Sequence, residues 1–182
     1  MTREPFIETF TGERFQPLAA DISTLNIIDI AHALSNQCRF SGHTKVHYSV
    51  AEHSVRVARL LASWSANRET QRWGLLHDAS EAYLVDLPTP LKASPVIGPA
   101  YRAAEAALMA AICTRFHLTL EQPDVVHEAD ATLLATEVRD LMWGRAEHWA
   151  GQLTAAPLPE RITPWSPREA ELEFLRVFKS LT

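Results

Sequence analysis

The sequence predicts a mainly α-helical protein with a small N-terminal β-hairpin. Three observations favour this class. Apolar residues recur at helical spacing, as in Val50, Val57 and Leu61. Prolines fall between the segments with this spacing. Only residues 5–18 alternate loosely around a Thr-Gly turn, as the two strands of a hairpin do.

The elements follow in order as one domain spanning residues 1–182. The hairpin at 5–18 needs a helical cover because two strands alone are marginally stable. A helical core is expected over about 25–150, and the last helix, 166–181, docks on it through one apolar face. Ser166 and Glu169 form a capping box at its start, with a proline at the first helical position. The core helices are expected at 29–34, 47–64, 69–84, 100–116 and 123–149.

Composition excludes several function classes. Of 182 residues, 47% are hydrophobic and 21% are charged, which predicts a folded domain. A net charge of −5 argues against a nonspecific binder of nucleic acid or anionic membranes. Cys38 and Cys113 have no CxxC spacing and are typical of thiols in a reducing compartment. The chain shows no apolar signal segment or membrane-spanning run, so a cytoplasmic location is expected.

The chain is organised around residues 73–90. An apolar helix is expected to lead there into the adjacent pair His77 and Asp78, followed by Glu81 and Asp86. Ionisable groups on an apolar element are costly unless they bind something. Glu81 shares a helix face with the pair and is placed to position water or relay a proton, although a solvated glutamate is the ordinary alternative. Asp86, two residues before a proline, is equally compatible with turn chemistry.

Two further ligand-type residues lie in apolar stripes of other predicted helices, namely His53 and Asp130. Alone, His53 would be a hydrogen-bonded core histidine, and Asp130 a cap or an arginine partner. Together with His77 and Asp78 they predict a metal site, because a buried carboxylate needs a compensating cation. Mixed imidazole and carboxylate ligands favour one Mn, Co, Fe, Ni or Zn ion. Adjacent helical residues point about 100° apart, so the ion must sit against the flank of their helix.

These residues resemble the HD-domain metal-dependent phosphohydrolases. The order His53, His77-Asp78, Asp130 matches the ligand pattern of that superfamily over roughly residues 25–143. The strings HDASE at 77–81 and DLPTPLK at 86–92 are similar to those of YfbR-like 5′-deoxynucleotidases and of phage HD triphosphohydrolases. The resemblance implies an HD-domain helical bundle that is a homodimer or higher oligomer.

The resemblance also assigns roles. It implies that His53, His77, Asp78 and Asp130 bind the metal, that Glu81 protonates the leaving 5′ oxygen or guides water, and that Asp86 contacts the sugar 3′-hydroxyl. The family's Arg-Trp pair corresponds to Arg39 and Phe40 here, a phosphate ligand and a residue packing near sugar and base. An arginine suits phosphate because its planar fork donates two parallel hydrogen bonds. Lys45 is a further candidate phosphate contact, and a core or surface role fits it equally well.

The expected function is therefore hydrolysis of the 5′-phosphate of a (deoxy)nucleoside monophosphate, a small-molecule substrate, by metal-activated water. A dNTP triphosphohydrolase that releases triphosphate uses the same residues and stays open. A non-catalytic HD binding module is the alternative outside enzymes. A guanosine-tetraphosphate hydrolase fits less well, because that family resembles HDxxED and Ala82 follows Glu81 here.

Overall fold

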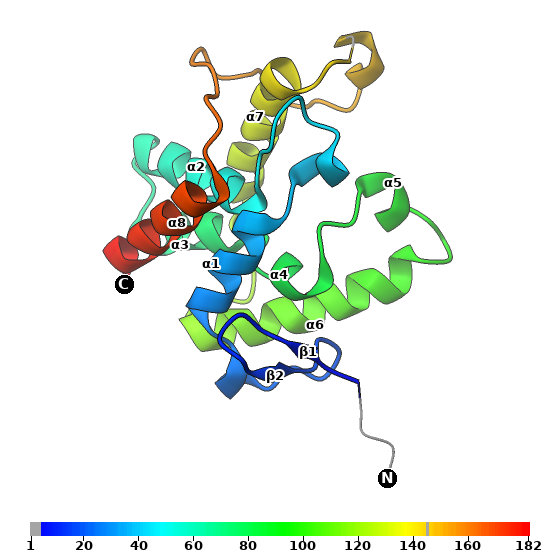
Figure 1. The fold of residues 1–182 in the computed structure, drawn as a ribbon. Helices are drawn as coiled ribbons and strands as arrows, with labels where there is room; N and C mark the ends of the chain where they lie inside the picture. The colour runs from blue at the N-terminus through cyan, green and yellow to red at the C-terminus, as the bar shows by residue number, and fades with distance from the viewer. Residues whose placement is uncertain (1–4, 145) are drawn as a thin grey trace.

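The computed structural model describes residues 5–144 and 146–182, and it confirms the mainly helical class with an N-terminal hairpin. In Figure 1, α2, α3 and α8 lie side by side, α1 packs on α8 and α2, and α6 runs along the base. The α-helices are α1 (Ile27–Asn36), α2 (Val50–Ser63), α3 (Arg68–Leu76), α4 (Glu81–Leu84), α5 (Thr89–Lys92), α6 (Gly98–Phe116), α7 (Asp124–Leu141) and α8 (Pro167–Leu181). Short 3-10 turns add η1 (Ile22–Thr24), η2 (Arg39–Gly42) and η3 (Ala146–Trp149).

Helix α2 is the centre of the fold, because it packs against α1, α3, α7 and α8. Its buried apolar side chains recur at the predicted spacing, with Val50, Val57 and Leu61 fully buried. The helix begins at Val50 rather than 47, because the Ser49 side chain accepts a hydrogen bond from the Glu52 amide and caps it there. His53 therefore sits one turn into a rigid, buried element.

The predicted helix 69–84 is two helices with a break. Helix α3 ends at Leu76, residues 77–80 turn, and α4 begins at Glu81. Within the turn the Ala79 amide donates to the Leu76 carbonyl and the Glu81 amide to the Asp78 carbonyl, at 2.9 and 3.0 Å. His77 and Asp78 are thus turn residues, and the expectation that the ion lies against a helix flank is wrong. The backbone of the turn, and not helical periodicity, sets the directions of the His77 and Asp78 side chains.

The predicted helix 123–149 ends early, at Leu141, where Met142 adopts an extended conformation. Lys45 takes up the carbonyl groups left over at this end. Its amide donates to the Leu141 oxygen at 2.8 Å and its ammonium to the Asp140 oxygen at 3.1 Å. This cap from a distant segment replaces further turns. Residue 145, within the predicted span, lies outside the described residues.

The N-terminal hairpin and the C-terminal helix α8 are both held to the core. The capping box of Ser166 and Glu169 is confirmed, and Phe174 and Leu181 of α8 are buried as predicted. Strands β1 (Ile7–Glu8) and β2 (Arg14–Phe15) pair antiparallel, within the expected 5–18. Helices do cover this hairpin: Thr11 donates through its amide and hydroxyl to Asp29 of α1, at 2.7 and 2.8 Å.

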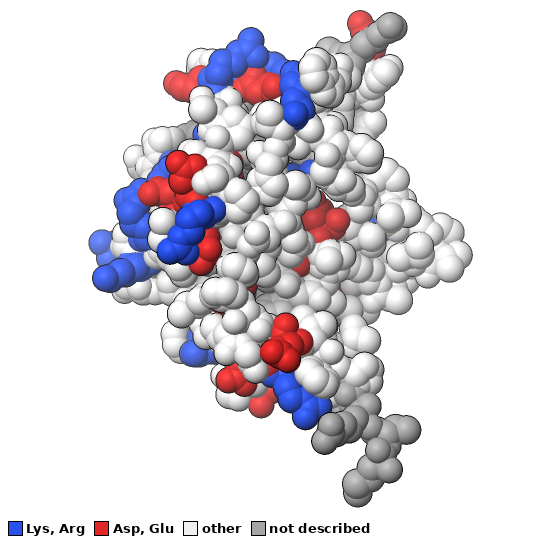
Figure 2. Space-filling model, viewed as in Figure 1, with Lys and Arg blue, Asp and Glu red and all other residues white. Residues whose placement is uncertain are grey.

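The charged surface is uneven. Figure 2 shows Lys and Arg together with Asp and Glu at the top, on the left and at the bottom of this face, and a further group of acidic side chains near its middle. Among the described residues, no helix is long and apolar enough to cross a membrane.

Candidate metal centre

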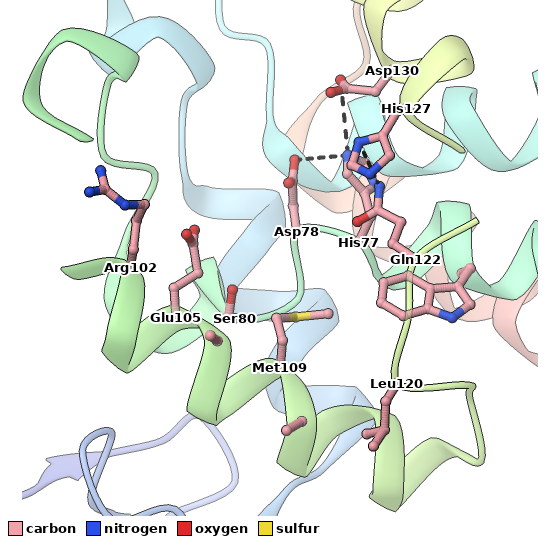
Figure 3. Close-up of a pocket in the computed structure, with 13 residues that line it drawn as sticks. His77, Asp78, Ser80, Arg102, Glu105, Met109, Leu120, Gln122, His127 and Asp130 are labelled. Carbon is pink, nitrogen blue, oxygen red and sulfur yellow. Dashed lines mark hydrogen bonds and ion pairs between the residues drawn. The ribbon is translucent and has the colours of Figure 1, made fainter. Parts of the chain in front are cut away.

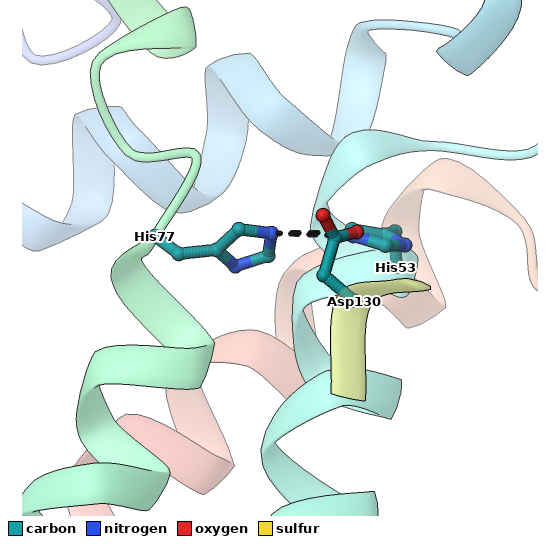
Figure 4. A group of neighbouring side chains, drawn as sticks. All are labelled: His53, His77 and Asp130. Carbon is teal, nitrogen blue, oxygen red and sulfur yellow. Dashed lines mark hydrogen bonds and ion pairs between the residues drawn. The ribbon is translucent and has the colours of Figure 1, made fainter. Parts of the chain in front are cut away.

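His53, His77 and Asp130 form a group that can hold a metal ion (Figure 4). They come from α2, from the end of α3 and from α7, and their ligand atoms all lie within 4.8 Å of one another. His53 Nε2 is 3.3 Å from His77 Nε2 and 3.1 Å from Asp130 Oδ1. Two ligands bound at about 2.1 Å to one ion lie about 3 Å apart, so these separations suit a shared ion.

Asp78 also reaches this group, although its exposure is greater than that of His53. Its Oδ2 lies 3.3 Å from His77 Nε2 and 3.8 Å from His53 Nε2. The four residues predicted as ligands are therefore neighbours, brought together by helices α2 and α7 and the turn that follows α3. The donors are two imidazole nitrogens and two carboxylates, a set that suits a divalent transition metal.

Both histidines present Nε2 to the common centre. His77 Nδ1 is 2.8 Å from the carbonyl oxygen of Gly74, which can only accept, so Nδ1 carries the hydrogen. His53 Nδ1 is 2.6 Å from Oε1 of Glu137 and donates in the same way. In the neutral form of each imidazole, Nε2 then has its lone pair available for a cation.

The electrostatics of the group demand positive charge at this place. Burial and Arg39 act to lower the pKa of His53, but Glu137 and Asp130 outweigh them and raise it to about 9. Burial acts to raise the pKa of Asp130, yet the hydrogen bond and charge of His53 hold it far below its usual range. In the metal-free chain a proton on His53 offsets the carboxylates, and a divalent ion would do so on binding.

Arg39 lies beside the ligands. Its Nε donates to Glu137 Oε2 at 3.1 Å and its Nη1 to Asp78 Oδ2 at 3.4 Å, and its side chain is 13% exposed. Glu137 is fully buried and also accepts from the Tyr48 hydroxyl at 3.0 Å. Glu137 was not among the residues predicted from the sequence. The signal was there, because Glu137 follows Asp130 by seven residues, two turns along the same helix face.

Glu81 is 4% exposed and belongs to a buried acidic cluster. Burial raises its pKa to about 9, with Asp78 and Asp86 adding to the effect against Arg39 and Lys92. Its Oε1 lies 3.6 Å from Lys92 Nζ, and its Oε2 has no hydrogen-bond partner within the described part of the chain. Glu81 therefore holds a proton near neutral pH. It starts α4, so the expected shared helix face with His77 is wrong, and the 77–80 turn sets its position instead.

Asp86 lies just beyond α4 and is half-buried. Burial raises its pKa, with Arg39 opposing. Gln37, which sequence reasoning did not select, braces this segment: it donates to the Glu81 carbonyl at 2.9 Å and accepts from the Asp86 amide at 3.3 Å. An amide side chain in a polar loop carries no sequence signal for this role.

Phe40 and Lys45 lie away from the ligand atoms. Phe40 has a left-handed backbone (φ 54°), its ring centroid is 5.5 Å from the Arg39 guanidinium carbon, and the edge of Trp149 meets it at 6.2 Å between centroids. Lys45 caps the end of α7, and its ammonium lies 5.4 Å from the ring centroid of Trp143. The described contacts of Lys45 are at that helix end and not among the metal-binding residues.

A cavity of about 630 Å³ opens onto the ligands (Figure 3). His77, Asp78 and Asp130 form one end, and α6 supplies a wall with Arg102, Glu105 and Met109. The remaining lining residues are Trp73, Ser80, Ala106, Ala110, Leu120, Gln122 and His127. The volume is that of a small-molecule site.

The chain is 36% identical over 179 residues to the uncharacterized protein YfdR of Escherichia coli K12, which covers 97% of this chain and 96% of YfdR. The chain belongs to the YfdR family. It is also 38% identical over 124 residues to an uncharacterized protein of Rhodobacter capsulatus, RCAP_rcc00048, covering 65% of this chain and 62% of that protein. No model of a known protein family matches the chain. The match to YfdR extends over nearly the whole length of both chains.

Proposed function

We propose that this member of the YfdR family is a metal-dependent phosphohydrolase that removes the 5′-phosphate of (deoxy)nucleoside monophosphates. The observation that carries the proposal is the meeting of a His/Asp metal group, an arginine in contact with Asp78, and the protonated carboxyl Glu81. The resemblance of the ligand order and of the HDASE and DLPTPLK strings to HD-domain phosphohydrolases supports it.

His53, His77, Asp78 and Asp130 would hold one divalent ion, with Mn, Co, Fe, Ni and Zn as candidates. Such an ion supplies a water of lowered pKa and polarises phosphoryl oxygens. The protein's part is to fix both imidazoles through Nδ1, so that Nε2 of each faces the centre.

Arg39 would bind the phosphate. Its Nε is held by Glu137 and its Nη1 contacts Asp78, and among the described residues Nη2 has no protein acceptor. A guanidinium held by two carboxylates in this way can still offer the hydrogens of Nη2 to the phosphoryl oxygens. It would offset the negative charge of the transferring group.

Glu81 would donate a proton to the leaving 5′ oxygen. A carboxyl with a pKa raised to about 9 is protonated at the pH where a phosphomonoester is a dianion. The carboxylate of Asp86 interacts with the positive charge of Arg39, and the Asp86 backbone amide donates to Gln37. This carboxylate would accept a hydrogen bond from the sugar 3′-hydroxyl. Phe40 would pack against the sugar or base.

The charge of the cavity favours one phosphate over three. Its lining has three carboxylates, Asp78, Glu105 and Asp130, against one guanidinium, Arg102. A divalent ion would bring this net charge of −2 to zero. A dianionic monophosphate would then need little beyond Arg39, which contacts Asp78 but does not itself line the cavity, whereas a triphosphate, with about twice the negative charge, would need more cations. The dNTP triphosphohydrolase is therefore the second candidate.

A nucleotide panel tests the proposal. The metal-stripped protein is reloaded with Mn²⁺ or Co²⁺ and given dNMPs, NMPs and dNTPs, with orthophosphate, pyrophosphate and triphosphate resolved as products. Orthophosphate from dNMPs is expected. Triphosphate from dNTPs would replace the nucleotidase by the alternative, and a protein that retains no transition metal after reconstitution would be a non-catalytic module.

The cellular location and the oligomeric state are also proposals. Two unpaired cysteines, Cys38 and Cys113, suit the cytoplasm, where thiols stay reduced. A homodimer or higher oligomer is the assembly that the resemblance implies, and sedimentation of the purified protein measures it.

A further inference from the structure

The side chain of Glu137 contacts both a residue of the metal group, His53, and the proposed phosphate-binding residue, Arg39. It is fully buried on α7, two turns after Asp130. Its Oε1 accepts from His53 Nδ1 at 2.6 Å and from the Tyr48 hydroxyl at 3.0 Å. Its Oε2 accepts from Arg39 Nε at 3.1 Å. One carboxylate thus contacts two groups that the proposed chemistry needs.

We propose that Glu137 is a positioning residue that fixes the His53 imidazole for the metal and the Arg39 guanidinium for the phosphate. Metal binding and phosphate binding then both depend on this one side chain. The inference about metal binding rests on geometry alone, and the inference about phosphate binding rests on the proposed function.

The geometry calls for a carboxylate. All three partners are donors, namely an imidazole N–H, a phenol O–H and a guanidinium N–H, and an ionised carboxylate is a group that only accepts. The oxygens are divided between the partners, so the imidazole and the guanidinium do not compete. A glutamine would turn an NH₂ group toward at least one donor, and the buried site would lose that contact without solvent to replace it.

The two contacts orient their partners. A hydrogen on His53 Nδ1 leaves Nε2 as the lone-pair nitrogen facing His77 and Asp130. The contact of Arg39 Nε with Glu137 restricts the guanidinium, whose Nη1 lies 3.4 Å from Asp78 Oδ2. Without Glu137 the imidazole of His53 could turn or carry its hydrogen on the other nitrogen. Arg39 would lose the hydrogen bond that fixes the orientation of its guanidinium.

The chain offers a matched control in Glu52. This carboxylate is also fully buried, and it accepts from an arginine, Arg56, and from the Trp165 amide at 2.8 Å. None of these contacts touches a proposed ligand. Glu52→Gln therefore disturbs a buried carboxylate–arginine contact of the same kind without reaching the metal group.

The test uses the metal-stripped full chain as wild type, Glu137→Gln, Glu52→Gln and Arg39→Ala. Calorimetry and visible absorption measure Co²⁺ binding, and inorganic phosphate is then titrated into the Co²⁺-loaded protein. Glu137→Gln should weaken Co²⁺ binding by about 10–100-fold, change the Co²⁺ spectrum, and weaken phosphate binding at least about tenfold. Glu52→Gln should stay within about threefold of wild type in both titrations. Arg39→Ala should lose phosphate binding but keep Co²⁺ binding.

The inference would be overturned if the Co²⁺ affinity of Glu137→Gln stayed within about threefold of wild type. It would also be overturned if Glu52→Gln lost as much Co²⁺ affinity as Glu137→Gln. If Glu137→Gln does not fold, Glu137→Asp keeps the charge but shortens the reach, and unchanged Co²⁺ affinity in that variant overturns the inference as well. Failure of the proposed function is a separate outcome: no nucleotide is hydrolysed, while the Co²⁺ titrations still decide the role of Glu137.

Discussion

His53 Nε2 and His77 Nε2 lie 3.3 Å apart, although 24 positions separate the two residues in the chain. The two Nδ1 atoms bind the Gly74 carbonyl and Glu137, so both Nε2 atoms face the same point, where His53 Nε2 also lies 3.1 Å from Asp130 Oδ1. The two imidazoles are therefore arranged to share one cation. Asp78 and Asp130 approach the same point and supply the negative charge that a cation would neutralise.

Removing a ligand should remove the metal. His77→Ala is expected to lose the bound ion and to reduce nucleotide turnover by more than about 100-fold, because one of four ligands is gone. Plasma mass spectrometry of the reloaded variant measures the metal. His148→Ala, at an exposed histidine, is the control and should match wild type. Full activity of His77→Ala at native metal content would remove the site assignment.

Replacing the arginine by lysine should separate charge from geometry. Arg39→Lys keeps the positive charge, but an ammonium cannot hold Glu137, Asp78 and a phosphate along one plane. The value of kcat/KM for a dNMP should fall by about 10–100-fold, with metal content unchanged. Steady-state kinetics and metal analysis on one preparation check this, and kinetics equal to wild type would exclude Arg39 as the phosphate ligand.

Glu81→Gln should make the metal-free protein more stable at alkaline pH. The folded pKa of Glu81, about 9, is raised above the ordinary 4.5, so its stability contribution is fully present below about pH 4.5 and lost as pH rises toward 9. Glutamine cannot ionise and avoids that loss. At pH 8 the variant should exceed wild type by at least about 1 kcal/mol, the equivalent of one pKa unit, and at pH 4.5 the two should agree.

Thermal denaturation at both pH values measures this difference. The same variant should lose about 10²–10⁴-fold in turnover when loaded with metal, since it cannot donate a proton. A stability gain that is equal at pH 4.5 and pH 8 would contradict the buried-acid account.

Asp140 should hold the segment after α7 in place. Its buried side chain pairs with Arg139 and Arg161 and accepts from the Ile162 amide at 2.9 Å. Arg139 above all holds the pKa of Asp140 far below its usual range, so this stability is present above about pH 4 and lost as pH falls further.

Asp140→Asn should therefore cost about 1–3 kcal/mol at pH 7, with a smaller difference near pH 2. Chemical denaturation at the two pH values measures it, and limited proteolysis should cut the variant faster between residues 147 and 165. The exposed Glu147→Gln serves as the control. An equal loss at both pH values would show that the charge of Asp140 is not what matters.

Much of the fold could be predicted from local patterns in the sequence. The capping box of Ser166 and Glu169 needs only adjacent residues, and the structure contains it. The end of α3 could not be seen, because apolar spacing continues across the turn at 77–80 and only tertiary packing separates the two helices. The end of α7 was missed for a similar reason: Lys45, nearly 100 positions away, caps it.

The candidate site divides in the same way. His53, His77, Asp78 and Asp130 were selected as ligand-type residues on apolar elements, and they lie together. Glu137 and Gln37 were not selected, because their roles exist only through partners brought near by the fold. Residues that touch the reacting groups leave a chemical pattern in the sequence, whereas residues that hold them in place leave little.

An ion held by α2, the end of α3 and α7 would also be a reversible cross-link. It would join residues 53, 77 and 130 in a chain whose two cysteines are unpaired. Because the unfolded chain has no such site, bound metal adds to folding free energy by mass action, about 2.7 kcal/mol at a free concentration 100 times Kd. Metal supply would then set how long this protein survives in the folded state, as well as whether it can react.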